Sequence, residues 1–359
     1  MTVDAVGGVW RYALDLAAGL KGRGLETVFA IFGPAPSAQQ RRDAEAVGSV
    51  FWCDAPLDWM VETQSELKRV PEIIDHLARQ VGADFVHINL PSQAAGLRLD
   101  IPIVVVSHSC VTTWFHAVRG TDVPPSWQWQ EELNRSGFAR AETVLSPSRS
   151  HAALLGEVYG RIDRLDVVWN GSRVCTPIDA KEDMVFAAGR WWDEGKNGAV
   201  LDAAAAEMIW PLMMAGARRG PSGQHLALNH ARARAELSHT DTIAGMAKAA
   251  VFVSPSLYEP FGLSVLEAAR CGCALVLADI PTYRELWDGA ALFADPRDPQ
   301  AIAQAVNRLA MDEALRWQLA ERALARSKRF TIEAQSDAML AIYGRLLSSS
   351  RVLSVAESS

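Results

Sequence analysis

Two glutamates eight residues apart, Glu259 and Glu267, mark the segment of this sequence that points most directly to chemistry. The stretch that contains them reads SPSLYEPFGLSVLEAA, and an apolar run that predicts a strand ends just before it. Open α/β sheets bind ligands beyond the carboxyl ends of their strands, so Glu259 is predicted to lie at a ligand site. The alternative is that Glu259 is only a favourable charge at a helix start and Glu267 an exposed surface group.

The helix expected to begin at Gly262 suits a phosphate group. The backbone N–H groups of Gly262, Leu263 and Ser264 would lack partners inside the helix, and the helix dipole adds positive charge there. A glycine also lets a ligand approach the backbone closely. Glu267 falls among the apolar residues of this helix, and a buried carboxylate needs a partner. The two hydroxyls of a ribose would supply one.

Two cations follow the strand predicted over 184–188, in the sequence GRWWDEGKN. Arg190 offers a planar fork that fits phosphate oxygens, and Lys196 offers a compact point charge. The pattern favours an anion site at the end of this strand. The alternative is a solvated basic pair in a loop.

Polar groups also follow strands in the first half of the chain. Gly7 and Gly8 form a predicted tight turn before the first helix, and His108 ends the apolar strand predicted over 101–107. His87, near another strand end, is a weaker candidate for a ligand contact. The other histidines show no metal-ligand spacing and are predicted to be surface groups.

These motifs resemble glycosyltransferase family 4, a family of retaining enzymes with the GT-B fold and an E-x7-E motif. The resemblance covers nearly the whole chain, from Gly7 to the last helix. It implies that Glu259 contacts the transferred sugar near the anomeric centre and that Glu267 binds the donor ribose. It also implies the fold class, α/β with two Rossmann-like doubly wound domains facing across a cleft.

The resemblance assigns roles to the remaining motifs as well. Arg190 and Lys196 match a Gly-Arg…Lys-Asn element that binds the donor pyrophosphate, where each fixed cation would lower the barrier by roughly 3–4 kcal/mol. His108 matches a histidine that contacts the donor sugar. The implied catalytic residues are Glu259, His108, Arg190 and Lys196. The implied donor-binding residues are Glu267, Phe261, Gly262, Leu263, Gly7 and Gly8.

The implied reaction moves a hexose from a UDP- or GDP-sugar to a glycan or lipid-linked acceptor. The chain contains no D-x-D sequence, which holds a divalent metal in the other large glycosyltransferase fold, so no metal and no cofactor are expected. A GT-B sugar epimerase or phosphorylase, and a non-catalytic relative that binds glycan or nucleotide, remain as alternatives. An NAD-dependent oxidoreductase is disfavoured because GGVWR lacks the G-x-G-x-x-G pattern.

Apolar strands alternate with helices along the whole chain, which predicts parallel sheets covered on both faces. A length of 359 residues suggests two domains. We expect an acceptor-side domain over 1–170, a donor domain over 171–331, and a C-terminal helix over 332–359 that returns to the first domain. The hinge is expected near 170–179.

Composition limits the remaining function classes. The formal net charge is −7, so a nucleic-acid partner is not expected. No secretory signal and no apolar run of about 18 residues is visible, so the sequence predicts a cytoplasmic protein and leaves peripheral membrane contact open. The aromatic stretch over 114–129 is expected to be a loop that either stacks on the acceptor or packs on its own domain as a hydrophobic flap.

Overall fold

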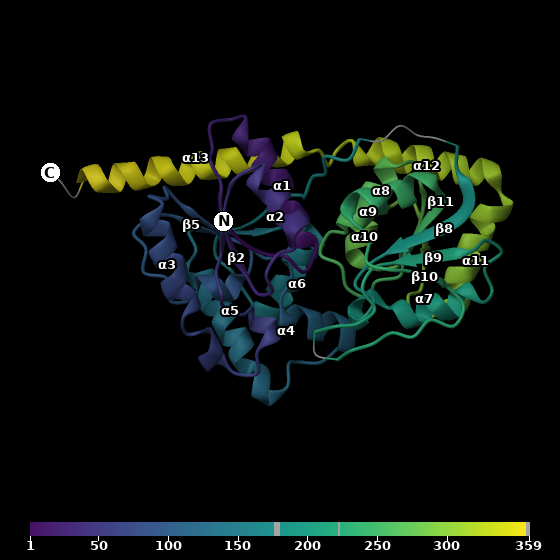
Figure 1. The fold of residues 1–359 in the computed structure, drawn as a ribbon, viewed down its shortest axis with the longest axis horizontal. Coiled ribbons are helices and arrows are strands. Elements are labelled where there is room, and N and C mark those ends of the chain that lie inside the picture. Colours follow the sequence, from purple (N-terminus) through teal and green to yellow (C-terminus); the bar gives the residue numbers. More distant parts are fainter. Residues whose placement is uncertain (176–179, 222, 357–359) are drawn as a thin grey trace. The chain divides into compact units, whose positions relative to one another are not determined.

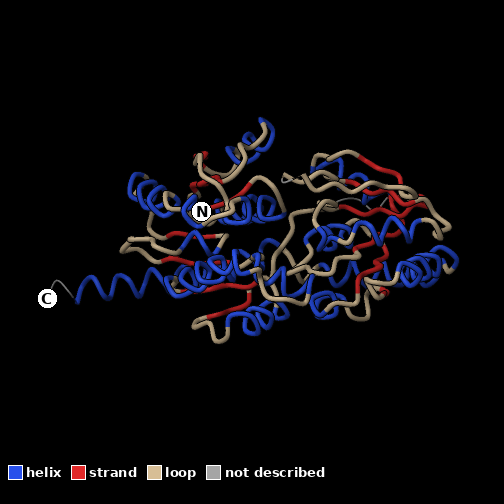
Figure 2. The backbone as a smooth tube through the Cα atoms, turned by 90° about the horizontal axis from the view of Figure 1, so that it is seen from below, coloured by secondary structure: helices blue, strands red, loops and turns tan. Residues whose placement is uncertain are grey.

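The computed structural model describes residues 1–175, 180–221 and 223–356, which form two compact units (Figure 1). Unit 1 comprises Met1–Gly171 and Ile332–Ser359, and unit 2 comprises Ser172–Thr331. Of the hinge expected over 170–179, residues 176–179 lie outside the described residues. Figure 2 shows helices packed against the strands within each unit.

Unit 1 contains two short parallel sheets. The first has the order β1-β2-β3, and the second has the order β4-β5-β6-β7. Their bounds are β1 (Thr2–Asp4), β2 (Val28–Phe32), β3 (Ser49–Trp52), β4 (Val86–Ile88), β5 (Ile103–Val106), β6 (Thr143–Ser146) and β7 (Leu165–Val167). Strand pairs within both sheets run parallel, as the alternating pattern predicted.

Side-chain contacts join these two sheets between β1 and β4. The backbone N–H of Asn89 donates to Thr2 Oγ1 at 3.0 Å, and its side-chain amide donates to the Thr2 carbonyl at 2.7 Å. The side-chain oxygen of Asn89, Oδ1, lies 3.0 Å from Nε2 of the buried His87. Because an amide oxygen only accepts, Nε2 of His87 carries its proton, and Tyr343 donates to Nδ1 at 2.7 Å.

The helices of unit 1 lie around these sheets and include the C-terminal helix. Their bounds are α1 (Gly8–Lys21), α2 (Ala38–Glu45), α3 (Val70–Gln80), α4 (Val111–Trp114), α5 (Gln128–Arg140), α6 (Arg149–Tyr159) and α13 (Ile332–Ala356). Shorter turns are η1 (Asp58–Met60), η2 (Gln64–Leu67), η3 (Pro91–Ala94), the π-helical η4 (Phe115–Arg119) and η5 (Pro125–Trp127).

Helix α13 packs along α1, as the yellow and purple ribbons of Figure 1 show. Gly19 makes this approach close, because a Cβ added there would lie 2.3 Å from Ser336 Oγ. Tyr343 anchors the same helix to β4 through its bond to His87. The part of α13 over 332–343 therefore belongs to the core of unit 1.

The stretch over 114–129 is mostly helical, so the expectation of a loop was wrong. Phe115 is buried and meets the Trp127 ring edge-on, and Trp129 already lies on α5. The Arg119 guanidinium lies over the Trp114 and Phe115 rings, 5.2 and 5.0 Å from their centres. These ring contacts are local to unit 1 and match the packed flap.

Two elements of unit 1, β3 and α2, bury few of their side chains. Strand β3 is largely exposed, and α2 buries only Ala44. A capping box between Ser37 and Gln40 starts α2 instead. Helix α6 begins at a cap from Ser148, which accepts from the backbone N–H of His151 at 3.0 Å.

Unit 2 is built on one parallel sheet with the order β10-β9-β8-β11-β12-β13. Its strands are β8 (Glu182–Ala188), β9 (Leu212–Ala215), β10 (Arg232–Arg234), β11 (Ala249–Ser254), β12 (Ala274–Ala278) and β13 (Leu292–Ala294). Strands β11 and β12 are buried along their whole length, which explains their continuous apolar sequences.

The helices of unit 2 are η6 (Glu194–Lys196), α7 (Gly198–Ala205), α8 (His239–Lys248), α9 (Leu263–Arg270), α10 (Pro281–Trp287), α11 (Pro299–Met311) and α12 (Glu313–Ser327). The segment over 299–327 forms two helices, α11 and α12. Asp312 separates them, because its carboxylate accepts from the Leu315 N–H at 2.9 Å and caps α12. None of the described helices is long and apolar enough to cross a bilayer.

Two helix glycines provide a matched test of the packing in unit 1. A Cβ added to Gly137 on α5 would lie 1.9 Å from the Pro91 carbonyl oxygen, whereas one added to Gly156 on α6 meets nothing within 4 Å. Gly137→Ala should lower the free energy of unfolding by about 1–3 kcal/mol through overpacking. Gly156→Ala should raise it by about 0.5–1 kcal/mol. Guanidinium unfolding followed by circular dichroism measures both, and equal effects would contradict the close crossing of α5 and η3.

Acid should destabilise unit 1 through His87. Burial, with a smaller contribution from the Met1 ammonium, lowers the pKa of His87 to about 3. Below pH 6.5 the unfolded chain therefore binds a proton that the folded chain does not, and stability falls by about 1.4 kcal/mol per pH unit. Unfolding at pH 7 and pH 5 should show this loss in the wild type and a smaller one in His87→Gln. Identical pH dependence in both proteins would refute it.

Candidate functional site

The structure brings Lys196 and Glu259 together at the edge of the unit 2 sheet. Lys196 Nζ donates to Glu259 Oε2 at 2.5 Å, and the two side chains are 21% and 15% exposed. They reach this contact from loops that follow β8 and β11, which are neighbours in the sheet. The parallel arrangement places both loops at the same edge, although the two residues are far apart in sequence.

Backbone contacts hold the two loops independently of the ion pair. The Leu257 N–H donates to the Gly195 carbonyl at 2.9 Å. Asn197, in the left-handed region with φ of 58°, donates its side-chain amide to the carbonyls of Pro255 and Pro296 at 3.0 and 2.6 Å. The position of the lysine is therefore set by the fold before any ligand binds.

Arg190 is directed by the aromatic pair that follows it. Trp191 is buried and donates its indole N–H to the Ala215 carbonyl at 2.8 Å, which anchors the turn in the core. The Arg190 guanidinium lies 5.6 Å from the centre of the Trp192 ring, and its Nη2 is 3.6 Å from Asp193 Oδ2. With a side chain 37% exposed, it remains accessible to an anion.

Gly262 has the left-handed conformation, with φ of 89° and ψ of 62°, as the N-cap of α9. A Cβ added there would lie 3.0 Å from Tyr283 Cε1 and 3.4 Å from Glu259 Cγ. Among the described residues no side chain caps α9. The Val265 N–H donates to the Gly262 carbonyl at 3.1 Å, so the N–H groups of Leu263 and Ser264 are those that a ligand could meet at this helix start.

Glu267 is buried on α9, with 5% of its surface exposed, as expected for a carboxylate that needs a partner. That partner is His239, whose Nε2 lies 2.8 Å from Glu267 Oε1. The His239 side chain is 36% exposed, in line with the predicted surface position, but its contact with Glu267 was not predicted from the sequence. Ser238 caps α8 by accepting from the Asp241 N–H at 3.1 Å, and this S-x-x-D pattern could have placed His239 at the helix start.

Phe261 serves the packing of unit 2. Its ring is buried and meets the Phe330 ring edge-on, with 5.7 Å between their centres. A ligand contact at this position is therefore open only to its backbone. Residues 260–263 form a short, tightly packed connection between the Glu259 loop and α9.

The predicted site residues of unit 1 are Gly7, Gly8 and His108. Gly7 is the N-cap of α1, and Gly8 is its first residue. The half-buried His108 lies with Nε2 3.0 Å from Asn89 Oδ1, the oxygen that also accepts from His87. Because Nε2 donates there, Nδ1 of the neutral His108 ring keeps its lone pair as an acceptor.

Burial and the neighbouring histidines His87 and His151 lower the pKa of His108 to about 3, so its ring is neutral at neutral pH. His87 is buried, and both of its ring nitrogens are hydrogen-bonded, to Tyr343 and to the Asn89 oxygen that His108 also contacts. This burial argues against a direct ligand contact for His87. His151 is buried too, and the expectation that it lies on the surface was wrong, because it packs beside Ser107.

Two family models match this chain. The family model described as "Glycosyltransferase Family 4" matches residues 6–173, and the one described as "Glycosyl transferases group 1" matches residues 222–326. The second range includes Glu259 and Glu267, whereas Arg190 and Lys196 lie between the two ranges. Together the two models match well over half of the chain.

Curated relatives include glycosyltransferases from bacteria. The O-antigen chain mannosyltransferase B of Escherichia coli is 39% identical over 87 residues, which are 24% of this chain and 23% of that protein. The chain thus matches less than a quarter of that relative's length. The D-inositol 3-phosphate glycosyltransferase of Xylanimonas cellulosilytica is 27% identical over 304 residues, covering 73% of this chain and 72% of that protein.

Solved structures share the fold along nearly the whole chain. Sucrose-phosphate synthase from Thermosynechococcus elongatus superposes with a TM-score of 0.80 at 17% identity, covering 97% of this chain and 99% of that one. Anabaena HepE in complex with UDP and glucose has a TM-score of 0.74 at 17% identity, with coverage of 96% and 98%. The predicted GT-B class is confirmed, and with the matches of both family models the chain belongs to glycosyltransferase family 4.

Proposed function

We propose that this protein transfers a hexose from a nucleoside-diphosphate sugar to a glycan or lipid-linked acceptor, with retention of the anomeric configuration. The observation that carries the proposal is the Lys196–Glu259 pair, which stands at the carboxyl edge of the unit 2 sheet. Arg190 and the uncapped start of α9 belong to the same unit and add the positive charge that a diphosphate requires.

In this proposal unit 2 binds the donor. Lys196 and Arg190 contact the pyrophosphate and stabilise the charge that develops on it as the sugar leaves. Glu259 contacts sugar hydroxyls near the anomeric carbon while it keeps Lys196 oriented. The amide groups of Gly262 and Leu263 add hydrogen bonds at the start of α9.

Glu267 contacts the donor ribose with help from His239. The imidazole donates to Oε1 of Glu267 and leaves the second carboxylate oxygen for the ribose hydroxyls. Glu267 is 5% exposed, so its burial costs desolvation energy that a hydrogen bond must offset. The bond from His239 offsets part of that cost and also fixes the orientation of the carboxylate. We therefore place His239 in the donor site as a positioning residue.

Unit 1 supplies the acceptor side. It also carries three residues for which the resemblance implies donor contacts. Nδ1 of the neutral His108 ring can accept a hydrogen bond from a hydroxyl of the donor sugar, and Gly7 and Gly8 lie at the start of α1, where no side chain among the described residues caps the helix. The relatives are named for mannosyl and inositol-phosphate glycosyl transfer, and HepE was solved with UDP and glucose. These names support a nucleotide-sugar donor, with UDP- and GDP-hexoses as the first to test.

Removing the Lys196 cation should disable transfer. Lys196→Ala is expected to lower kcat/KM for a UDP- or GDP-hexose about 100-fold or more, because the leaving diphosphate loses its fixed cation. The exposed Lys248 serves as the matched control, and Lys248→Ala should retain wild-type turnover. Radiolabel transfer to a glycan acceptor measures both. Near-normal turnover in Lys196→Ala, or transfer that requires inorganic phosphate, would overturn the proposal.

Activity should also persist in EDTA, since the proposed site stabilises the diphosphate with protein cations. The assay compares initial transfer rates before and after exhaustive chelation. Loss of activity that added Mn²⁺ or Mg²⁺ restores would show that a metal takes part.

The His239–Glu267 contact predicts a separate effect on donor affinity. His239→Leu should weaken binding of UDP or GDP about tenfold, because the Glu267 carboxylate, which we propose binds the ribose, loses a charge-assisted hydrogen bond. His239→Gln, which keeps a donor group, should weaken binding less. The exposed His230 provides the control variant His230→Leu. Isothermal titration calorimetry measures each dissociation constant, and unchanged binding in His239→Leu would remove this residue from the site.

A further inference from the structure

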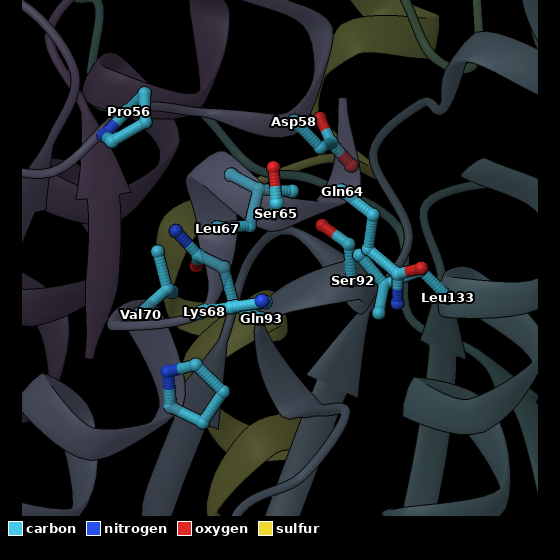
Figure 3. Close-up of a pocket in the computed structure, with 11 residues that line it drawn as sticks. Pro56, Asp58, Gln64, Ser65, Leu67, Lys68, Val70, Ser92, Gln93 and Leu133 are labelled. Carbon is cyan, nitrogen blue, oxygen red and sulfur yellow. The ribbon is translucent and has the colours of Figure 1, made fainter. Parts of the chain in front are cut away.

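A cavity of about 400 Å³ lies within unit 1, and none of the residues singled out from the sequence lines it (Figure 3). Its polar wall comes from Asp58, at the start of η1 after β3, and from Ser92 and Gln93, in η3 after β4. The cavity therefore lies where loops follow the carboxyl ends of two strands, the usual location of ligand sites in α/β sheets.

Two buried acceptors on this wall have no hydrogen-bond partner among the described residues. Asp58 is 2% exposed and Gln93 is 5% exposed, and the unpartnered atoms are Asp58 Oδ2 and Gln93 Oε1. The backbone of Asp58 is fixed, because Gln130 donates its side-chain amide to the Asp58 carbonyl at 2.7 Å. A buried acceptor left without a donor costs about 1–3 kcal/mol, so both positions call for hydrogen-bond donors.

The charge of the wall restricts the kind of ligand that could supply those hydrogen-bond donors. Burial above all raises the pKa of Asp58 to about 6, the nearby Asp4 carboxylate adds to the shift, and hydrogen bonds from Ser92 and the Trp59 backbone oppose it. An anionic ligand would bring another negative charge beside this acid. The only cation among the lining residues, Lys68, is exposed, so its charge is screened by solvent. An uncharged ligand with several hydroxyl groups meets the requirement better than a phosphate does.

The rest of the wall is mixed, because the polar side chains of Gln64, Ser65 and Lys68 line the cavity as well as apolar residues. Pro56, Leu67, Val70 and Leu133 line the cavity together with the polar groups. A sugar ring combines hydroxyl donors at its edge with C–H groups on its faces, so it fits such a mixed wall. A volume of about 400 Å³ lies within the range of small-molecule sites, roughly 300–1,000 Å³.

We propose that this cavity binds one uncharged sugar ring of the acceptor, whose hydroxyl groups donate to Asp58 and Gln93. The inference rests on the proposed glycosyl transfer and deepens it, because it names both the acceptor chemistry and its subsite. It excludes a sugar phosphate as the group held in this cavity. Ordered water at Asp58 and Gln93 is the competing account, and the experiment below separates the two.

Binding to the full chain tests the proposal without requiring turnover. The probes are the methyl α-glycosides of mannose, glucose, galactose and N-acetylglucosamine, with mannose 6-phosphate and inositol phosphate as charged competitors. Saturation-transfer NMR should detect at least one uncharged glycoside on the wild type. Gln93→Met, which removes the amide at nearly constant volume, should weaken that binding about tenfold, and Asp58→Asn should also weaken it.

The exposed Gln80 on α3 lies outside the cavity, so Gln80→Met is the matched control and should bind like the wild type. Binding of UDP or GDP should stay within about twofold of wild type in every variant, because none of the proposed donor-binding residues lines this cavity. Because these substitutions lie in unit 1, a wild-type circular dichroism spectrum and thermal unfolding transition show separately that each variant is folded. Should Asp58→Asn fail to fold, Gln93→Met still decides the question.

Three results would overturn the proposal. They are absence of binding by every uncharged glycoside, undiminished binding in Gln93→Met, and binding of the phosphorylated sugars alone. The proposed function fails separately if the wild type binds no nucleoside diphosphate. A protein that binds UDP or GDP but shows one of these three results would keep the donor site and lose the acceptor subsite.

Discussion

The ion pair between Lys196 and Glu259 depends on two loops that a parallel sheet brings to one edge. Hydrogen bonds from Leu257 to Gly195 and from Asn197 to Pro255 hold those loops without help from the charges. A partly buried pair of this kind gains little net stability, because desolvation offsets much of the attraction. Its position beside the open start of α9 is better explained by the anion that we propose unit 2 binds.

The two units handle polar groups in different ways. Unit 2 brings the charged side chains of Lys196 and Glu259 together at its strand ends, whereas unit 1 groups the neutral side chains of His87, Asn89 and His108 around β4 and β5. The low pKa values of both histidines keep their rings uncharged at neutral pH. A neutral hydrogen-bonding surface suits sugar hydroxyls, and fixed cations suit a diphosphate. The proposed division of labour between acceptor and donor follows from that contrast.

Sequence patterns predicted the elements whose burial is complete. Strands β11 and β12 are apolar at every position, and the glycine at position 262 has a conformation that favours glycine. Elements that are not fully buried were not predicted from the sequence, and the exposed strand β3 is an example. The contact of His239 was not predicted either, because a histidine at a helix start does not by itself indicate a ligand or a partner, and its partner Glu267 lies on another helix.

The sequence by itself determined the α/β class, the likeness to a family and the segments that carry cations and glutamates. Each of these depends on apolar runs, helix starts and short motifs, which are patterns formed by residues close together in the sequence. Tertiary structure alone decided that His239 meets Glu267 and that Asp58 and Gln93 share one cavity. Those pairings join residues from separate elements, and only the packed chain decides which buried acceptors receive a donor and which are left without one.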